Sequence, residues 1–145
     1  MDYFKIQAKL LEAYGKEPAK WKHKVIDGNA YHSPDGTYIV IIPENYHKLA
    51  ISENEKFLGF ENVMKSIDDK EYVEAQLVLE TRKVGKVTAT KLKAEKFDVW
   101  VDEKKLKAYG RPLDFSFFAA SPILPVKIIC DGVLVGILSP MNLKS

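Results

Sequence analysis

Two stretches decide the fold, because they align without a gap: FKIQAKLLEAYGK at residues 4–16 and VWVDEKKLKAYGR at residues 99–111. Five aligned pairs are identical, and the offset is 95 throughout. The identical pairs are Lys9 with Lys104, Leu11 with Leu106, Ala13 with Ala108, Tyr14 with Tyr109, and Gly15 with Gly110. This self-similarity indicates that one structural unit occurs twice.

A second match follows in the same order. DGTYIVIIPEN at residues 35–45 resembles DGVLVGILSPMN at residues 131–142, with one residue inserted before the proline. Two ordered matches at nearly equal offsets favour an internal duplication that covers about residues 1–45 and 97–145.

Each copy has the pattern of a strand, a short helix and a hairpin. Phe4 and Ile6, like Val99 and Val101, alternate with their neighbours as in a strand. The following residues predict a helix in each copy, because Leu11 and Tyr14, like Leu106 and Tyr109, are three residues apart. Asp102 is placed as an N-cap, and Gly15 and Gly110 are placed as C-caps.

The Asp-Gly pairs at 35–36 and 131–132 predict hairpins. Their flanking strands are expected at residues 24–32 and 38–42, and at 121–130 and 133–138, with Pro122 and Pro125 confining the third of these to a sheet edge or a bulged start.

The segment between the copies alternates apolar and polar residues over 74–82 and 86–101, around a third hairpin at 84–86. Residues 57–64 predict one more strand. Two helices and about eight strands favour an α+β fold, in which antiparallel sheets carry both short helices on one face. At 145 residues the chain is predicted to form a single domain.

Composition is that of a globular protein, with 46% hydrophobic and 29% charged residues. No apolar run is long enough to span a membrane, and the first residues lack the apolar stretch of a secretory signal. The single cysteine, Cys130, excludes an internal disulfide and is expected to be a buried structural thiol. These features predict a cytoplasmic protein.

Charge alternates along the chain although the net charge is only +2. Residues 1–24 hold six lysines and three acidic residues, and residues 86–111 hold eight basic and four acidic residues. Residues 44–80 hold four lysines and nine acidic residues. Segments of opposite charge are typical of opposite faces.

A domain built from two such units resembles one domain of a bacterial-type DNA sliding clamp, the polymerase III beta-subunit family. The C-terminal residues add to the resemblance, because VGILSPMNL at residues 135–143 is similar to the apolar last strand and Met-Pro-Met-Arg-Leu end of those clamps. Pro140, Met141 and Leu143 match, whereas Ser139 and Asn142 depart. Bacterial clamps join three such domains in one chain, so a ring of this chain would require a homo-oligomer.

The resemblance implies that the helices face duplex DNA. The basic residues of the two predicted helices then contact the phosphate backbone without reading its sequence. They are Lys5, Lys9 and Lys16 on the first helix and Lys104, Lys107 and Arg111 on the second. The alternative interpretation is that these residues form only the solvated faces of amphipathic helices.

In clamps the C-terminal segment helps to form an apolar pocket for short peptides of replication proteins. By this resemblance Pro140, Met141 and Leu143 are candidate partner-binding residues; alternatively, they cap the last strand.

Catalytic signatures are absent from the sequence. It contains no glycine-rich phosphate loop and no Gly-x-Ser-x-Gly motif. His23, His32 and His47 lack the paired spacing of a zinc site, and Asp68-Asp69 is expected in a solvated loop. We therefore expect no catalytic residues, no metal site and no cofactor.

The sequence thus favours a non-enzymatic, clamp-like domain associated with DNA replication, for example one encoded by a mobile element. The first alternative is a protein interaction module, or a mimic of a host clamp, on the same scaffold without DNA binding. The second is a small enzyme whose site is assembled from scattered residues.

Overall fold

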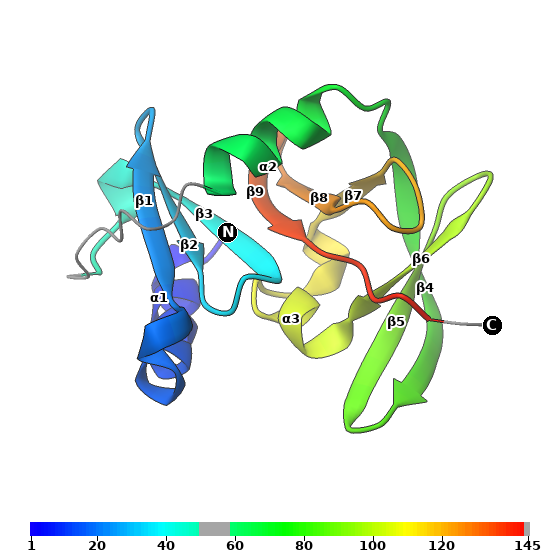
Figure 1. The fold of residues 1–145 in the computed structure, drawn as a ribbon, viewed down its shortest axis with the longest axis horizontal. Helices are drawn as coiled ribbons and strands as arrows, with labels where there is room; N and C mark the ends of the chain where they lie inside the picture. Colours follow the sequence, from blue (N-terminus) through cyan, green and yellow to red (C-terminus); the bar gives the residue numbers. More distant parts are fainter. Residues whose placement is uncertain (50–58, 144–145) are drawn as a thin grey trace. The chain divides into compact units, whose positions relative to one another are not determined.

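The structure is a computed structural model that describes residues 1–49 and 59–143, with side chains described outside 59–62 (Figure 1). The chain divides into two compact units, Met1–Asp69 and Lys70–Ser145. In both units the strands pair antiparallel and the helices are short. This architecture confirms the predicted mixed composition of antiparallel strands and short helices.

Unit 1 begins with a helix and continues as a three-stranded antiparallel meander. Its elements are α1 (Tyr3–Lys16), the 3-10 turn Pro18–Lys20, β1 (Lys22–Ile26), β2 (Asn29–Ser33), β3 (Tyr38–Pro43), the 3-10 turn Glu44–Tyr46 and α2 (Gly59–Asp68). The core of this unit is formed by apolar residues of β3 together with Ile6 and Leu10 of α1.

Unit 2 contains six strands in the order β9-β8-β7-β4-β5-β6. Its elements are β4 (Val73–Val84), β5 (Val87–Lys93), β6 (Asp98–Asp102), α3 (Glu103–Lys107), the 3-10 turn Pro112–Asp114, β7 (Ser116–Ala119), β8 (Val126–Cys130) and β9 (Val133–Leu138). The segment α3-β7-β8-β9 has the same order of elements as α1-β1-β2-β3, a helix followed by a meander.

The first predicted strand is wrong, because residues 4–6 belong to α1. Asp2 caps this helix by accepting a hydrogen bond from the backbone N–H of Lys5 at 3.1 Å. Ile6 and Leu10, one helical turn apart, are both buried, whereas Phe4 is 84% exposed. The four-residue spacing of buried side chains therefore outweighs the short alternation at residues 4–6.

The strand predicted over 57–64 is also wrong where the structure describes it, because α2 begins at Gly59. Residues 57 and 58 lie outside the described residues. Ile67 is fully buried and Val63, one turn earlier, is half-buried, which is helical spacing. The described residues thus contain three α-helices and nine strands, against the two and about eight predicted.

Two hairpins have Asp-Gly turns of the type I′ class, in which both residues have positive φ. Asp131 and Gly132 have φ of 49° and 77°, and join β8 to β9 as predicted. Asp27 and Gly28 have φ of 48° and 80° and divide the predicted strand 24–32 into β1 and β2. The strand predicted over 121–130 is shorter than expected, because β8 begins only after Pro125.

The third and fourth hairpins agree with the sequence. Gly36 has φ of 85°, and its N–H donates to Ser33 Oγ in the loop that joins β2 to β3. Gly85 has φ of 64° in the turn between β4 and β5, where Val84 pairs with Val87. Both turns confirm the predicted hairpins.

The two aligned helices differ in length and in packing. α1 has 14 residues and α3 only five. Tyr14 is 37% exposed and lies edge-on to Trp21, with 5.4 Å between the ring centroids. Tyr109 is 1% exposed and covers Gly136. The order of elements recurs, but the environments of the aligned tyrosines do not.

The aligned glycines differ as well. Gly110 follows α3 with φ of 134°, whereas Gly15 lies inside α1, which continues to Lys16. The predicted C-cap roles of both glycines are therefore wrong, because the C-cap of α1 is Glu17 and that of α3 is Ala108.

Candidate functional site

The predicted basic stripe is present on α1. Lys5, Lys9 and Lys16 are all exposed, and the one acidic residue on the same stripe is Glu12. The helix buries its other side through Ile6, Gln7 and Leu10. Because the buried side fixes the rotation of α1, its lysines face solvent as a row of flexible positive charges.

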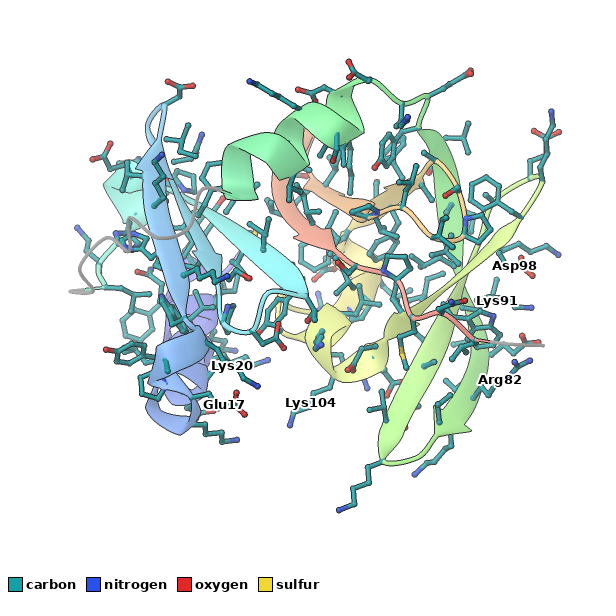
Figure 2. The ribbon with its side chains drawn as sticks, in the orientation of Figure 1. Glu17, Lys20, Arg82, Lys91, Asp98 and Lys104 are labelled. Carbon is teal, nitrogen blue, oxygen red and sulfur yellow. The ribbon has the colours of Figure 1, made fainter. Side chains whose placement is uncertain are left out.

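The basic residues around α3 differ from one another in their interactions. Asp102 Oδ1 accepts from the backbone N–H of Lys104 at 2.9 Å, which confirms the predicted N-cap. Lys104 is exposed and points away from the ribbon in Figure 2, whereas Lys107 pairs with Glu103 at 3.0 Å. Two neighbouring basic side chains on this short helix therefore differ in how readily they could bind a phosphate.

Arg111 is not on the second helix, contrary to the prediction, because α3 ends at Lys107. It precedes the 3-10 turn Pro112–Asp114, and its Nε donates to Asp114 Oδ2 at 3.1 Å. Both groups of this pair are exposed, so the bond is weak and can be exchanged for a phosphate.

The predicted partner-binding residues Pro140, Met141 and Leu143 are all half-buried. Met141 extends the edge of β6 by one bridge, in which its backbone N–H donates to the carbonyl of Trp100 at 2.7 Å. This bond gives the C-terminal segment a structural role.

Trp100 lies among charged side chains of β4 and β5. The Arg82 guanidinium is 4.9 Å and the Lys91 ammonium 5.6 Å from the centre of its ring. Lys91 in turn pairs with Glu80 at 2.6 Å and Asp98 at 3.6 Å, and its hydrogen bond to Glu80 is the main cause of its raised pKa. Figure 2 shows Arg82, Lys91 and Asp98 on the same side of unit 2. The ring is half-buried and makes cation–π contacts with these two basic side chains.

The structure also gathers three residues that sequence reasoning did not bring together: His23, His32 and His47. Their ligating nitrogens lie within 4.8 Å of one another. A signal for two of the three residues is present in the sequence, because a two-residue turn at Asp27-Gly28 places His23 directly opposite His32. His47 carries no comparable signal, since it lies beyond a second hairpin.

Two imidazoles of this cluster, those of His32 and His47, favour the neutral form. Burial, followed by the nearby His23 and His47, lowers the pKa of His32 to about 2. Burial is also the main reason for the lowered pKa of His47, which the carboxylate of Glu44 partly offsets. A neutral imidazole can accept a hydrogen bond or bind a metal ion.

No helix in the described part of the chain is long and apolar enough to cross a membrane. Comparisons with protein-family models, with curated proteins and with solved structures find no match to this chain.

Proposed function

We propose that this chain is a non-enzymatic, sliding-clamp-like protein associated with DNA replication, in which α1 contacts the phosphate backbone of duplex DNA. The observation that carries the proposal is the row of exposed lysines on a helix whose opposite side is buried. Such charges neutralise phosphates without reading the base sequence.

The length of α1 suits this contact. Lys5 and Lys16 are eleven residues apart, which corresponds to about 16 Å along the helix axis. One DNA strand presents a phosphate about every 3.4 Å, so the three lysines can reach separate phosphates. Glu12 opposes the contact, which limits its strength.

The recurring order of elements supports the comparison with a clamp domain. A helix followed by an antiparallel meander occurs in unit 1 as α1-β1-β2-β3 and in unit 2 as α3-β7-β8-β9. The unlike surroundings of Tyr14 and Tyr109 mean that this support comes from connectivity and not from matched packing. The five-residue helix α3, with Lys107 in an ion pair, is assigned the smaller share of DNA binding.

Two lysine-to-glutamine variants of equal charge test the assignment of α1. Lys5, Lys9 and Lys16 are replaced in the first, and the exposed Lys83, Lys86 and Lys96 of unit 2 in the control. Fluorescence anisotropy with labelled duplex DNA then gives the salt dependence of each affinity.

The α1 variant should reduce the slope of log K against log salt by about 1 for each lysine, whereas the control should reduce it far less. Equal losses in both variants would show that binding follows net charge alone and would overturn the role of α1.

The second candidate is a protein interaction module on the same scaffold. It is favoured by the exposed apolar side chains Leu79, Leu113 and Ile123 of unit 2. In that case purified protein would leave duplex DNA unbound at low salt but retain a replication protein in a pull-down, and replacing the half-buried Met141 and Leu143 by alanine would weaken that capture.

A further inference from the structure

Two of the three histidines are placed side by side by the register of a hairpin. His23 on β1 pairs with His32 on β2, because the Asp27-Gly28 turn sets Ile26 opposite Asn29. The two rings are parallel within 2°, and their centroids are 4.3 Å apart. Both side chains are buried, so the sheet fixes two imidazoles on the same face.

The third histidine comes from the segment after β3. His47 ends the 3-10 turn Glu44–Tyr46, where its backbone N–H donates to the Glu44 carbonyl at 3.1 Å. Its Nε2 lies 2.9 Å from Nε2 of His32. One of these nitrogens must donate and the other accept, since both rings favour the neutral form.

Gln7 of α1 holds the residues on both sides of His47. Its side-chain nitrogen donates to the carbonyl of Tyr46 at 3.0 Å, and its oxygen accepts from the N–H of Lys48 at 2.6 Å. The same nitrogen donates to the carbonyl of Tyr3, whose ring stacks on Tyr46 at 5.1 Å. A buried glutamine therefore fixes an irregular segment that would otherwise let His47 turn away from the other two rings.

The distances fit a single small ion. The three ligating nitrogens lie within 4.8 Å of one another, and zinc binds imidazole nitrogen at about 2.0–2.1 Å. Two ligands of a tetrahedral ion are then about 3.4 Å apart. The widest separation must close by at most about 1.4 Å to reach this spacing, a movement that rotations of two side chains can share. Among the described residues, Nδ1 of His32 is buried without a hydrogen-bond partner, so a ring rotation there breaks no bond at that atom.

We propose that His23, His32 and His47 bind one divalent transition-metal ion, with zinc as the best match. Three imidazole ligands favour zinc, cobalt, nickel or copper over magnesium and calcium, which prefer oxygen ligands. His47 is only half-buried, so a fourth ligand can reach the ion from solvent as water or as an anionic group. When the ion enters, the proton shared between the two Nε2 atoms moves to Nδ1 of the donor ring, and both Nε2 lone pairs bind the metal.

The site would join the β1–β2 hairpin to the segment that follows β3 within unit 1. It uses no group that is assigned to DNA contact, so its test is independent of the proposed function. All three histidines of the chain are in the cluster, and the single thiol, Cys130, is in unit 2. Metal bound by imidazole is therefore attributable to this site.

Calorimetric titration of the chelator-stripped, full-length protein with Zn²⁺, and visible absorption with Co²⁺, test the proposal. We expect one ion per chain, and cobalt absorption typical of nitrogen and oxygen ligands at low coordination number. The variant His47→Ala should lose affinity by more than the 10–100-fold typical of outer-shell changes, whereas the control Cys130→Ser should bind as the parent does.

Absence of saturable binding of either ion to the folded parent protein would overturn the proposal, whatever the variants do. Unchanged binding in a folded His47→Ala variant would overturn it as well. Gln7 is a positioning residue in this account. Gln7→Ala should weaken binding about 10–100-fold but leave the cobalt spectrum unchanged, because the three ligands remain. A changed spectrum would contradict that role.

Discussion

Acid should destabilise unit 1 through His32 in the metal-free protein. The pKa of His32 is about 2 in the folded state and about 6.5 when the chain is unfolded. A histidine with a lowered pKa contributes stability that is complete above pH 6.5 and is lost progressively as the pH falls towards 2. The loss arises because only the unfolded state takes up the proton in this range.

The magnitude follows from the difference between pH 6.5 and pH 5.0. Each pH unit in this range costs about 1.4 kcal/mol, so His32 alone should lower the free energy of unfolding by about 2 kcal/mol. His47 acts in the same direction, since its pKa is also lowered. Burial is the main cause in both residues.

Urea unfolding with a chelator present, at pH 7.5 and at pH 5.0, measures this loss. The chain has two tryptophans, and Trp21 lies edge-on to His32 with 5.5 Å between the ring centroids. In a Trp100→Phe background the fluorescence therefore reports on unit 1. The matched variant adds His32→Phe, which keeps a buried ring but cannot titrate.

Between the two pH values the free energy of unfolding of the variant should fall by about 2 kcal/mol less than that of the parent. All other groups titrate in both proteins, so the difference reports on His32 alone. Equal losses in the two proteins would refute the buried, neutral state assigned to His32.

Substitutions at four further positions test the packing and the backbone. Gly136→Ala should destabilise unit 2 by about 1–3 kcal/mol, because a Cβ there would lie 2.6 Å from Cζ and 2.8 Å from the hydroxyl of the buried Tyr109. Urea unfolding followed by Trp100 fluorescence measures this loss of stability, and an unchanged stability would contradict the packing of Tyr109 on Gly136. Asp102→Ala should cost about 0.5–2 kcal/mol by removing the cap of α3, whereas Asp102→Asn should retain most of the stability. Gly15→Ala should stabilise unit 1 by up to about 1 kcal/mol in thermal unfolding, since Gly15 is helical. Gly110→Ala should destabilise unit 2 by about 1–2 kcal/mol, since Gly110 has positive φ. Effects of the same sign would contradict the conformational difference between these aligned glycines.

The Asp-Gly turns and the N-cap at Asp102 were reliable guides to the fold, whereas the C-caps expected at Gly15 and Gly110 were wrong. The Asp-Gly pairs at 35–36 and 131–132 and the side chain of Asp102 act through neighbouring backbone, so their effect can be predicted from a few residues. The alternation of apolar and polar residues at 4–6 gave a wrong prediction, because three residues are too few to distinguish a strand from a helix. The burial of Ile6 and Leu10 by the rest of unit 1 decides in favour of the helix.

Of the two candidate sites, one could be predicted from local sequence and the other could not. The stripe of Lys5, Lys9 and Lys16 follows from helical periodicity, and all three side chains are exposed as that periodicity predicts. The histidine cluster depends on tertiary structure, because His47 reaches His32 only after β3 has returned alongside β2. Spacing in the sequence cannot reveal a ligand set that is assembled by a strand register and held by Gln7.

The salt dependence of duplex DNA binding by the unmodified protein tests the central claim most directly. Three phosphate contacts from α1 predict a slope of about −2.7 in log K against log salt, which is about a 40-fold loss of affinity between 50 and 200 mM salt. Any contacts made by Lys104, Lys107 and Arg111 would steepen that slope. An absence of binding at 50 mM salt, or an affinity that does not change with salt, would contradict the account.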